Sequence, residues 1–228
     1  MHWPVLHCYA DHKWTGPSEP LVRLCRGLSE RGWPCTLACR RTPRGELDEL
    51  ATRAREAGLH VLNDFWFSRR EGLLKAVGDV RRLGRLVSEG GYPLVHCHGT
   101  WDHIVAYWAL KGKRPEVSLV RTDHGAREYV RGYLHRYMYG PRMTDHLIVL
   151  SDRFLVQAVD RYGRDPATVS AIRGGVDTDE FRPEPALPGM RERLGLGSDD
   201  VVIGVVSRVQ RHRRFDVLVQ TAILTRGL

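Results

Sequence analysis

The stretch VLHCYADHKWTGPSEPLVRLCRGLSERGWPCTLAC, residues 5–39, decides the fold of this 228-residue chain. It begins with a short apolar run, Val5 to Ala10, which predicts a buried strand. After a polar loop, apolar residues recur at helical spacing from Leu21 to Leu28, and Gly32 supplies a stop signal before the strand-like run Pro34 to Cys39. The stretch therefore predicts a strand, helix and parallel strand in succession.

The same alternation of helix and strand continues through residue 172. Short apolar strands that alternate with amphipathic helices are typical of a parallel sheet with helices on both faces. We therefore expect an α/β fold with a Rossmann-like sheet. The expected helices are about 46–57, 70–89, 104–110, around 129–139 and 151–162, the last with Ser151 as N-cap and Gly163 as terminator, and the expected strands are 59–62, 93–97, 117–121, 146–150 and 169–172.

The composition changes after residue 172. Residues 173–189 are rich in glycine, proline and acids and show little apolar periodicity, which indicates a linker. Val201 to Val206 then predicts a strand and Phe215 to Leu224 a helix. We therefore predict a first domain over 1–173, a linker over 174–198, and the start of a second Rossmann-like domain over 199–228. One strand and one helix cannot bury both of their apolar faces, so this second domain would lack most of its core.

The overall composition limits the partners and the compartment. Lys and Arg outnumber Asp and Glu by 35 to 27, which favours an anionic partner: a phosphate-bearing small molecule, an acidic lipid head group and nucleic acid all fit, and so does a solvated basic surface. Five cysteines form an odd set without a C-x-x-C pair, which indicates a reducing cytoplasm. No apolar stretch approaches the ~20 residues of a membrane span, so we expect neither secretion nor a transmembrane anchor.

Polar residues follow three of the expected strands. In open α/β sheets the ligand site lies beyond the carboxyl ends of the strands. The three segments are Lys13 to Glu19 with Gly16, His96-Cys97-His98-Gly99, and Thr122-Asp123-His124-Gly125. Taken singly, Gly16 also fits an ordinary loop, and each histidine also fits a hydrogen-bonded core side chain. Together the segments predict a polar site at one edge of the sheet.

A metal centre is an alternative reading of the same histidines. Imidazoles and a carboxylate at His96, His98, Asp102, His103 and His124 have the chemistry of a metallohydrolase ligand set. The spacing argues against it, because three residues separate His98 from Asp102 where the common arrangement has fewer. We keep a His/Asp metallohydrolase as the lesser alternative.

A basic cluster follows the last expected strand. Arginines lie between a strand end and a helix start in Ser207 to Asp216, where free backbone N–H groups already favour phosphate. This placement favours a diphosphate site over a merely solvated basic face.

Taken in order, these segments resemble retaining glycosyltransferases of the GT-B architecture known as family 4. The matching pieces are the glycine loop after the first strand, His-x-His-Gly, Thr-Asp-His-Gly, the Ser-Asp helix start, Gly-Gly-Val-Asp-Thr-x-x-Phe-x-Pro at 174–183, and the strand-Ser-Arg segment with its basic residues and Phe-Asp. The resemblance covers essentially the whole chain. It implies a sheet domain that binds a glycan or lipid-linked acceptor and a second domain that binds a nucleotide-sugar donor, with no nucleic acid as partner.

The resemblance also implies roles for particular residues. His124 would be catalytic, and Gly16, Arg208 and Arg213 would bind the donor phosphates. The acceptor-side cleft would be lined by His98, Asp123 and Gly125. Neither a metal nor another cofactor would be required, and the protein would be cytoplasmic, with a basic balance compatible with peripheral contact to the inner face of an anionic membrane.

The chain departs from the family pattern in several places. Thr15 or Pro17 replaces one glycine of the loop, Arg213-Arg214 replaces a Lys-Gly pair, and Gly174 replaces an asparagine. The pair of donor-binding glutamates that family members carry further along has no counterpart here. We therefore expect a C-terminally truncated and inactive chain, with a noncatalytic domain that binds glycans or a membrane surface as the alternative function.

Overall fold

The structure, a computed structural model, describes residues 2–112, 116–125, 133–185, 187–207, 209–210 and 213–225. The chain divides into two compact units, Met1–Val176 and Asp177–Leu228. The division falls inside the segment predicted as a linker. Among the described residues, no helix combines the length and the apolar character that a membrane span requires.

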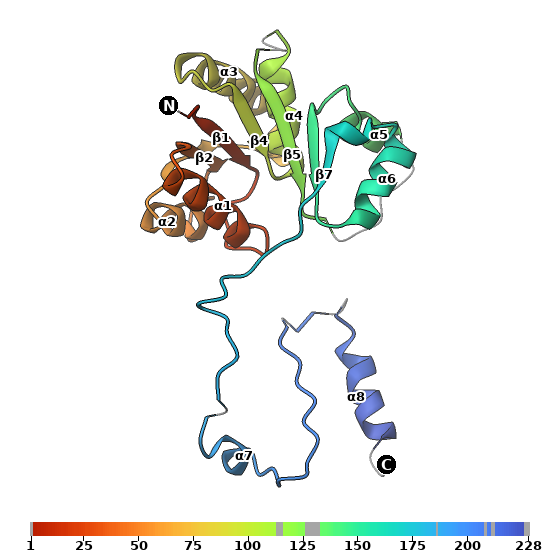
Figure 1. The fold of residues 1–228 in the computed structure, drawn as a ribbon. Helices are drawn as coiled ribbons and strands as arrows, with labels where there is room; N and C mark the ends of the chain where they lie inside the picture. Colours follow the sequence, from red (N-terminus) through yellow and green to blue (C-terminus); the bar gives the residue numbers. More distant parts are fainter. Residues whose placement is uncertain are drawn as a thin grey trace. The chain divides into compact units, whose positions relative to one another are not determined.

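The first unit is built on one sheet of seven parallel strands in the order β3-β2-β1-β4-β5-β6-β7 (Figure 1). The chain adds strands to one side of β1 and then crosses over to add β4 on the other side. Parallel strands of this kind need helical crossovers, which the alternating pattern supplies. The strands are β1 (Val5–Tyr9), β2 (Cys35–Arg40), β3 (His60–Phe65), β4 (Leu94–Cys97), β5 (Ser118–Asp123), β6 (His146–Val149) and β7 (Val169–Ala171).

Helices cover both faces of this sheet, which confirms the predicted α/β class. Helices α1 (Ser18–Glu30) and α2 (Glu49–Glu56) pack over β1, β2 and β3 on one face. Helices α3 (Leu73–Glu89) and α4 (Thr100–Leu110) pack on the other. Helix α5 (Tyr133–Tyr139) precedes β6, and α6 (Asp152–Tyr162) packs over β6 and β7. All five cysteines are free and buried, as expected of thiols that pack as small apolar groups.

Two helix boundaries show how local chemistry sets the elements. Helix α6 begins as predicted, since the Ser151 hydroxyl accepts a hydrogen bond from the Phe154 N–H, and it ends at Gly163 with a φ of 64°. The helix expected from residue 70 starts later. A short 3₁₀ turn, η1 (Arg69–Glu71), is followed by Gly72 with a φ of 88°, which no α-helix tolerates, so α3 begins at Leu73.

The second unit differs from its prediction. It contains α7 (Met190–Arg193) and α8 (Phe215–Leu224), but the segment 201–206 forms no strand. A strand is defined by hydrogen bonds to a neighbour, and the described part of this unit offers it none. Its apolar side chains are accordingly exposed, Val201 by 90% and Ile203 by 82%.

One buried arginine holds together the loops near β6 and β7. The Arg164 guanidinium donates to the carbonyl oxygens of Tyr139 at 2.9 Å, Thr144 at 3.2 Å, Asp145 at 3.0 Å and Thr168 at 3.1 Å. The side chain is almost completely buried. Its charge is therefore compensated by backbone dipoles from two separate loops.

We predict that Arg164→Met lowers the free energy of unfolding by about 3 kcal/mol, because four backbone carbonyls, all at least partly buried, lose a charged donor. Urea unfolding followed by circular dichroism measures the change. Arg26→Met is the matched control: Arg26 makes an exposed pair with Glu30 at 2.7 Å on α1, worth about 0.5 kcal/mol. Equal losses in the two variants would contradict the assigned role.

Candidate functional site

The candidate site lies at the carboxyl ends of β1, β4 and β5, which are neighbours in the sheet (Figure 1). The strand order reverses between β1 and β4, and such a switch point is where open α/β sheets bind ligands. The pairing register places His7 of β1 directly beside His96 of β4. The parallel sheet thus gathers polar residues that are far apart in the sequence.

A row of hydrogen-bonded imidazoles crosses this edge; we call His7, His98 and His124 the imidazole row. His7 Nδ1 lies 3.1 Å from His98 Nε2, and His98 Nδ1 lies 3.1 Å from His124 Nε2. The rings of His98 and His124 are stacked with centroids 5.4 Å apart. His96 lies beside the row and bonds through Nε2 to the Thr122 hydroxyl at 2.8 Å. The structure therefore brings together the predicted His98 and His124.

Burial favours the neutral form of His96, His98 and His124. Desolvation, with smaller effects from the neighbouring histidines, holds the pKa of His96 and of His98 well below the ordinary value. The pKa of His124 is also lowered, mainly by desolvation, although the Asp123 carboxylate acts in the opposite direction. A neutral imidazole carries one proton, so His98 donates one of its two hydrogen bonds in the row and accepts the other.

The His7 end of the row bears on the direction of these hydrogen bonds. Within the described residues, no side-chain partner lies within hydrogen-bond geometry of His7 Nε2, and the His7 side chain is fully buried. The competing group is the Cys35 thiol, whose pKa is lowered to about 5, first by Cys25 and also by His7. An unpaired lone pair is more easily tolerated at Nε2 than an unpaired N–H. On this ground we infer that His7 donates through Nδ1 to His98 and His98 through Nδ1 to His124, so that His124 carries its proton on Nδ1.

A tight turn after β4 fixes the position of His98. The Asp102 carboxylate accepts hydrogen bonds from the backbone N–H groups of His98 and Gly99, both at 2.8 Å, at the start of α4. A Cβ on Gly99 would lie 2.5 Å from Asp102 Oδ1, so only glycine fits. Burial raises the pKa of Asp102, while the Arg121 charge and these N–H groups lower it.

A buried arginine contacts the turn that contains His98 and Gly99. Arg121 of β5 donates to the Gly99 carbonyl and, at 3.3 Å, to the Tyr139 hydroxyl. Asp123 and Gly125 follow on the same strand end, and Asp123 Oδ1 accepts from the Gly125 N–H at 3.0 Å. The predicted cleft residues Asp123 and Gly125 are therefore adjacent to His124, with a fixed positive charge nearby.

Gly16 lies at the same edge, in the loop between β1 and α1. Its position is exposed, and a Cβ there would meet no atom within 4 Å. The Ser18 hydroxyl shapes the loop by accepting from the Thr15 N–H at 3.0 Å and donating to the Lys13 carbonyl at 3.0 Å. Since β4 lies between β1 and β5, Gly16 and His124 follow strands about 10 Å apart. Phosphate binding by Gly16 stays a prediction.

Two arginines, Arg208 and Arg213, were predicted to bind the donor phosphates. Arg208 lies outside the described residues, and Arg213 belongs to the second unit, where it precedes α8. Their contact with a diphosphate stays a prediction.

The residues of the metallohydrolase alternative do not share one function here. Asp102 bonds to backbone N–H groups, and His103 Nε2 bonds to the Thr144 hydroxyl at 2.8 Å. Instead, the ligand atoms of His7, His96 and His98 lie within 4.8 Å of one another. Of the three, His98 has both ring nitrogens in hydrogen bonds and could bind a metal ion only by giving up one of them.

The sequence reasoning missed two residues of this site, His7 and Arg121. His7 lies within an apolar strand, and the residues next to it in the sequence do not indicate a functional side chain. The available signal was its position two residues from Val5 and two residues from Tyr9. Because side chains alternate along a strand, this spacing places His7 on the face of the sheet that α1 covers. Arg121 could have been recognised because a charged residue inside a buried strand is uncommon.

Comparisons with known proteins give the family. The family model described as Glycosyltransferase Family 4 matches residues 16–180. D-inositol 3-phosphate glycosyltransferase of Thermobifida fusca is 32% identical over 141 residues, which make up 59% of this chain and 28% of that protein. The same-named protein of Kineococcus radiotolerans is 39% identical over 152 residues, 61% of this chain and 34% of that protein. The matched region thus spans about a third of these relatives.

Solved structures show the same fold. A glycosyltransferase from Rickettsia africae matches 99% of this chain and 58% of its own with a TM-score of 0.76 at 16% identity. Sucrose-phosphate synthase from Thermosynechococcus elongatus matches 98% of this chain and 60% of its own with a TM-score of 0.70 at 18% identity. These likenesses confirm the GT-B-like fold.

We predict that the protein loses stability as the pH falls below about 6.5. His96 and His98 have lowered pKa values when folded, so the unfolded chain takes up more protons in this range. Each such histidine contributes a slope of about 1.4 kcal/mol per pH unit. Urea unfolding at pH 7, 6 and 5 measures it. His96→Gln should make the slope shallower and the exposed control His60→Gln should not; a slope unchanged by His96→Gln would contradict the account.

Proposed function

This chain belongs to glycosyltransferase family 4, and on that premise we propose that it supplies the acceptor side of a site where a sugar passes from a nucleotide-sugar to an acceptor, with retention of configuration. The observation that carries the proposal is the His98–His124 hydrogen bond of 3.1 Å at the carboxyl ends of β4 and β5. It holds an imidazole at the edge where this fold class binds its ligands.

His124 would act as a hydrogen-bond donor to the reacting sugar. Its lowered pKa keeps it neutral near pH 7, and His98 occupies its Nε2, so Nδ1–H is the group left for a ligand. A neutral donor held in place gains its effect by being oriented before the reaction begins. His98 and His7 are then positioning residues.

The donor phosphates would lie near Gly16 and the N-terminus of α1. Helix N-termini favour anions through their free N–H groups and the helix dipole. Arg208 and Arg213 would neutralise the leaving diphosphate, so that guanidinium groups supply the positive charge that a metal provides elsewhere.

The acceptor would carry a phosphate group. A cavity of about 300 Å³ beside the ends of β2 and β3 is lined by Arg40, Arg41 and Arg44, with Trp66 and a single acid, Glu71. Glu71 is paired with Lys75 at 2.8 Å and, at a longer distance of 3.8 Å, with Arg40. The guanidinium groups are suited to phosphate, and the two named relatives carry inositol 3-phosphate in their names.

The test is sugar transfer from UDP-, GDP- and ADP-linked hexoses to D-inositol 3-phosphate and to lipid phosphates. We predict that His124→Ala lowers the rate about 100-fold, as loss of a transition-state hydrogen bond does. His146→Ala is the matched control, because His146 bonds to Ser170 at 2.9 Å on β6, away from the site.

If the unmodified chain transfers sugar at a measurable rate, transfer by His124→Ala within threefold of that rate would contradict the assignment. Binding of the acceptor without transfer from any donor agrees with the expected inactivity and with the noncatalytic domain alike.

A further inference from the structure

An apolar cavity of about 520 Å³ lies between α3 and α4. Its volume is within the range of small-molecule sites. Both helices contribute side chains from their first turns at the spacing i, i+3, i+4, i+7, which places each set on one helix face. The lining side chains are Leu73, Ala76, Val77 and Val80 of α3 and Trp101, Ile104, Val105 and Trp108 of α4.

This cavity is open to solvent at the molecular surface. Leu73 is 78% exposed and Trp108 is 51% exposed, and Leu74 beside them is 89% exposed. The deeper lining residue Val105 is buried in the core. The small side chain of Ala76 and the adjacent Gly72 leave the space that the two tryptophans border. A contiguous apolar surface of this kind indicates a binding site.

The cavity lies on the face of the sheet that is covered by α3 and α4, whereas His7 and His96 lie on the face covered by α1. Helix α3 begins after the carboxyl end of β3, and α4 begins after the carboxyl end of β4. Trp101 is the second residue of α4, whose start Asp102 fixes through its bonds to His98 and Gly99. The start of α4 therefore borders both the cavity and the turn that holds His98.

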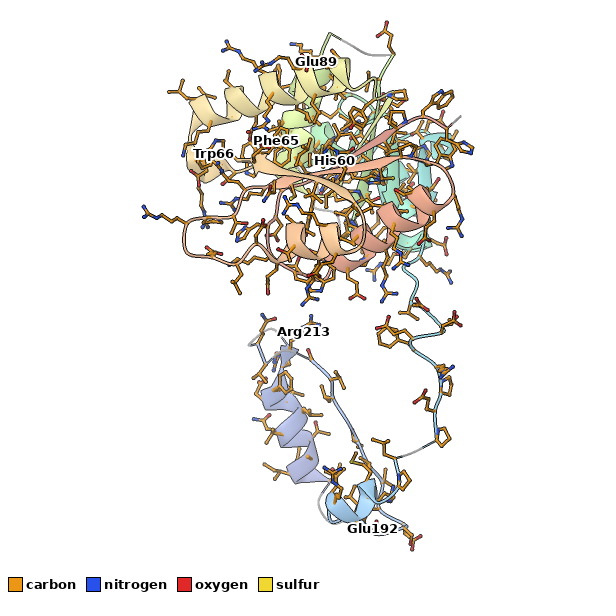
Figure 2. The ribbon with its side chains drawn as sticks, turned by 90° about the vertical axis from the view of Figure 1, so that its left-hand side faces the viewer. His60, Phe65, Trp66, Glu89, Glu192 and Arg213 are labelled. Carbon is orange, nitrogen blue, oxygen red and sulfur yellow. The ribbon has the colours of Figure 1, made fainter. Side chains whose placement is uncertain are left out.

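Cations border the cavity. Arg69 lines it, and Lys111 Nζ lies 4.8 Å from the ring centroid of Trp108. Outside the lining of this cavity, at the N-terminal end of α3 and opposite to the end marked by Glu89, the Trp66 ring is covered by Lys75 Nζ at 3.6 Å and Arg41 at 4.4 Å (Figure 2). None of the described residues that line the cavity is acidic. The surroundings suit an anionic head group.

We propose that this cavity binds the hydrocarbon chain of a lipid phosphate. The lining offers few polar groups beyond Ser68 and Arg69, so it would leave the hydroxyls of a sugar or the backbone of an extended peptide without partners. A hydrocarbon chain has no such groups to satisfy. This binding site does not depend on the proposed function.

The test is calorimetric titration of the 228-residue chain with butyl, octyl and dodecyl phosphate, each below its micelle-forming concentration. We predict that affinity rises about fourfold per added methylene until the cavity is filled. Ala76→Phe, which fills the cavity, and Trp108→Ala, which removes one wall, should each weaken dodecyl phosphate binding at least tenfold. Trp3→Ala is the matched control, because Trp3 is 67% exposed before β1 and should change the affinity less than twofold.

Several outcomes would overturn the inference. Unchanged affinity in Ala76→Phe, with its thermal unfolding midpoint preserved, would place the probe elsewhere. If dodecyl maltoside bound as tightly as dodecyl phosphate, the anionic head group would make no contribution to binding. If the chain bound only to phosphatidylglycerol vesicles, the surface would be a contact with a bilayer. If sedimentation showed a dimer that Trp108→Ala dissociates, the surface would be a contact with a second copy of the chain.

The two proposals fail separately. Transfer that depends on His124 without alkyl phosphate binding would refute the lipid cavity alone. Alkyl phosphate binding with transfer indifferent to His124→Ala would refute the proposed function and leave the cavity as a lipid site.

Discussion

The parallel pairing of β4 with β1 on one side and β5 on the other is the constraint on which the site depends. It places His7 beside His96 and brings the ends of β4 and β5 to one edge. Because side chains alternate along a strand, the same register puts His7, His96 and His98 on one face. The hydrogen bonds of the imidazole row are possible only with this register, and a shift by one residue would separate them.

Much of the first unit could be predicted from the sequence, because the hydrophobic period distinguishes buried strands from amphipathic helices. His98, Asp123 and His124 were found because they follow strand ends. His7 was not found, because its role depends on a hydrogen bond to His98, which lies 91 residues away in the sequence. The segment 201–206 was predicted as a strand from its apolar character, but pattern alone cannot supply the neighbouring strand that this conformation needs.

Burial of the histidines affects both their protonation state and the pH dependence of the stability. Imidazoles that are removed from water stay neutral, so they can form directed hydrogen bonds rather than repel one another. The same burial makes the sheet sensitive to acid. The cavity between α3 and α4 shares the start of α4 with the site, since Asp102 fixes both His98 and the turn before Trp101.

The orientation of His124 by the row is the central claim, and ¹⁵N NMR of the histidine side chains tests it most directly. The account predicts that His124 near pH 7 is neutral and protonated on Nδ1, and that His7→Phe shifts it toward a mixture of tautomers. His124 protonated on Nε2 in the unmodified chain, or a tautomer unaffected by His7→Phe, would contradict it.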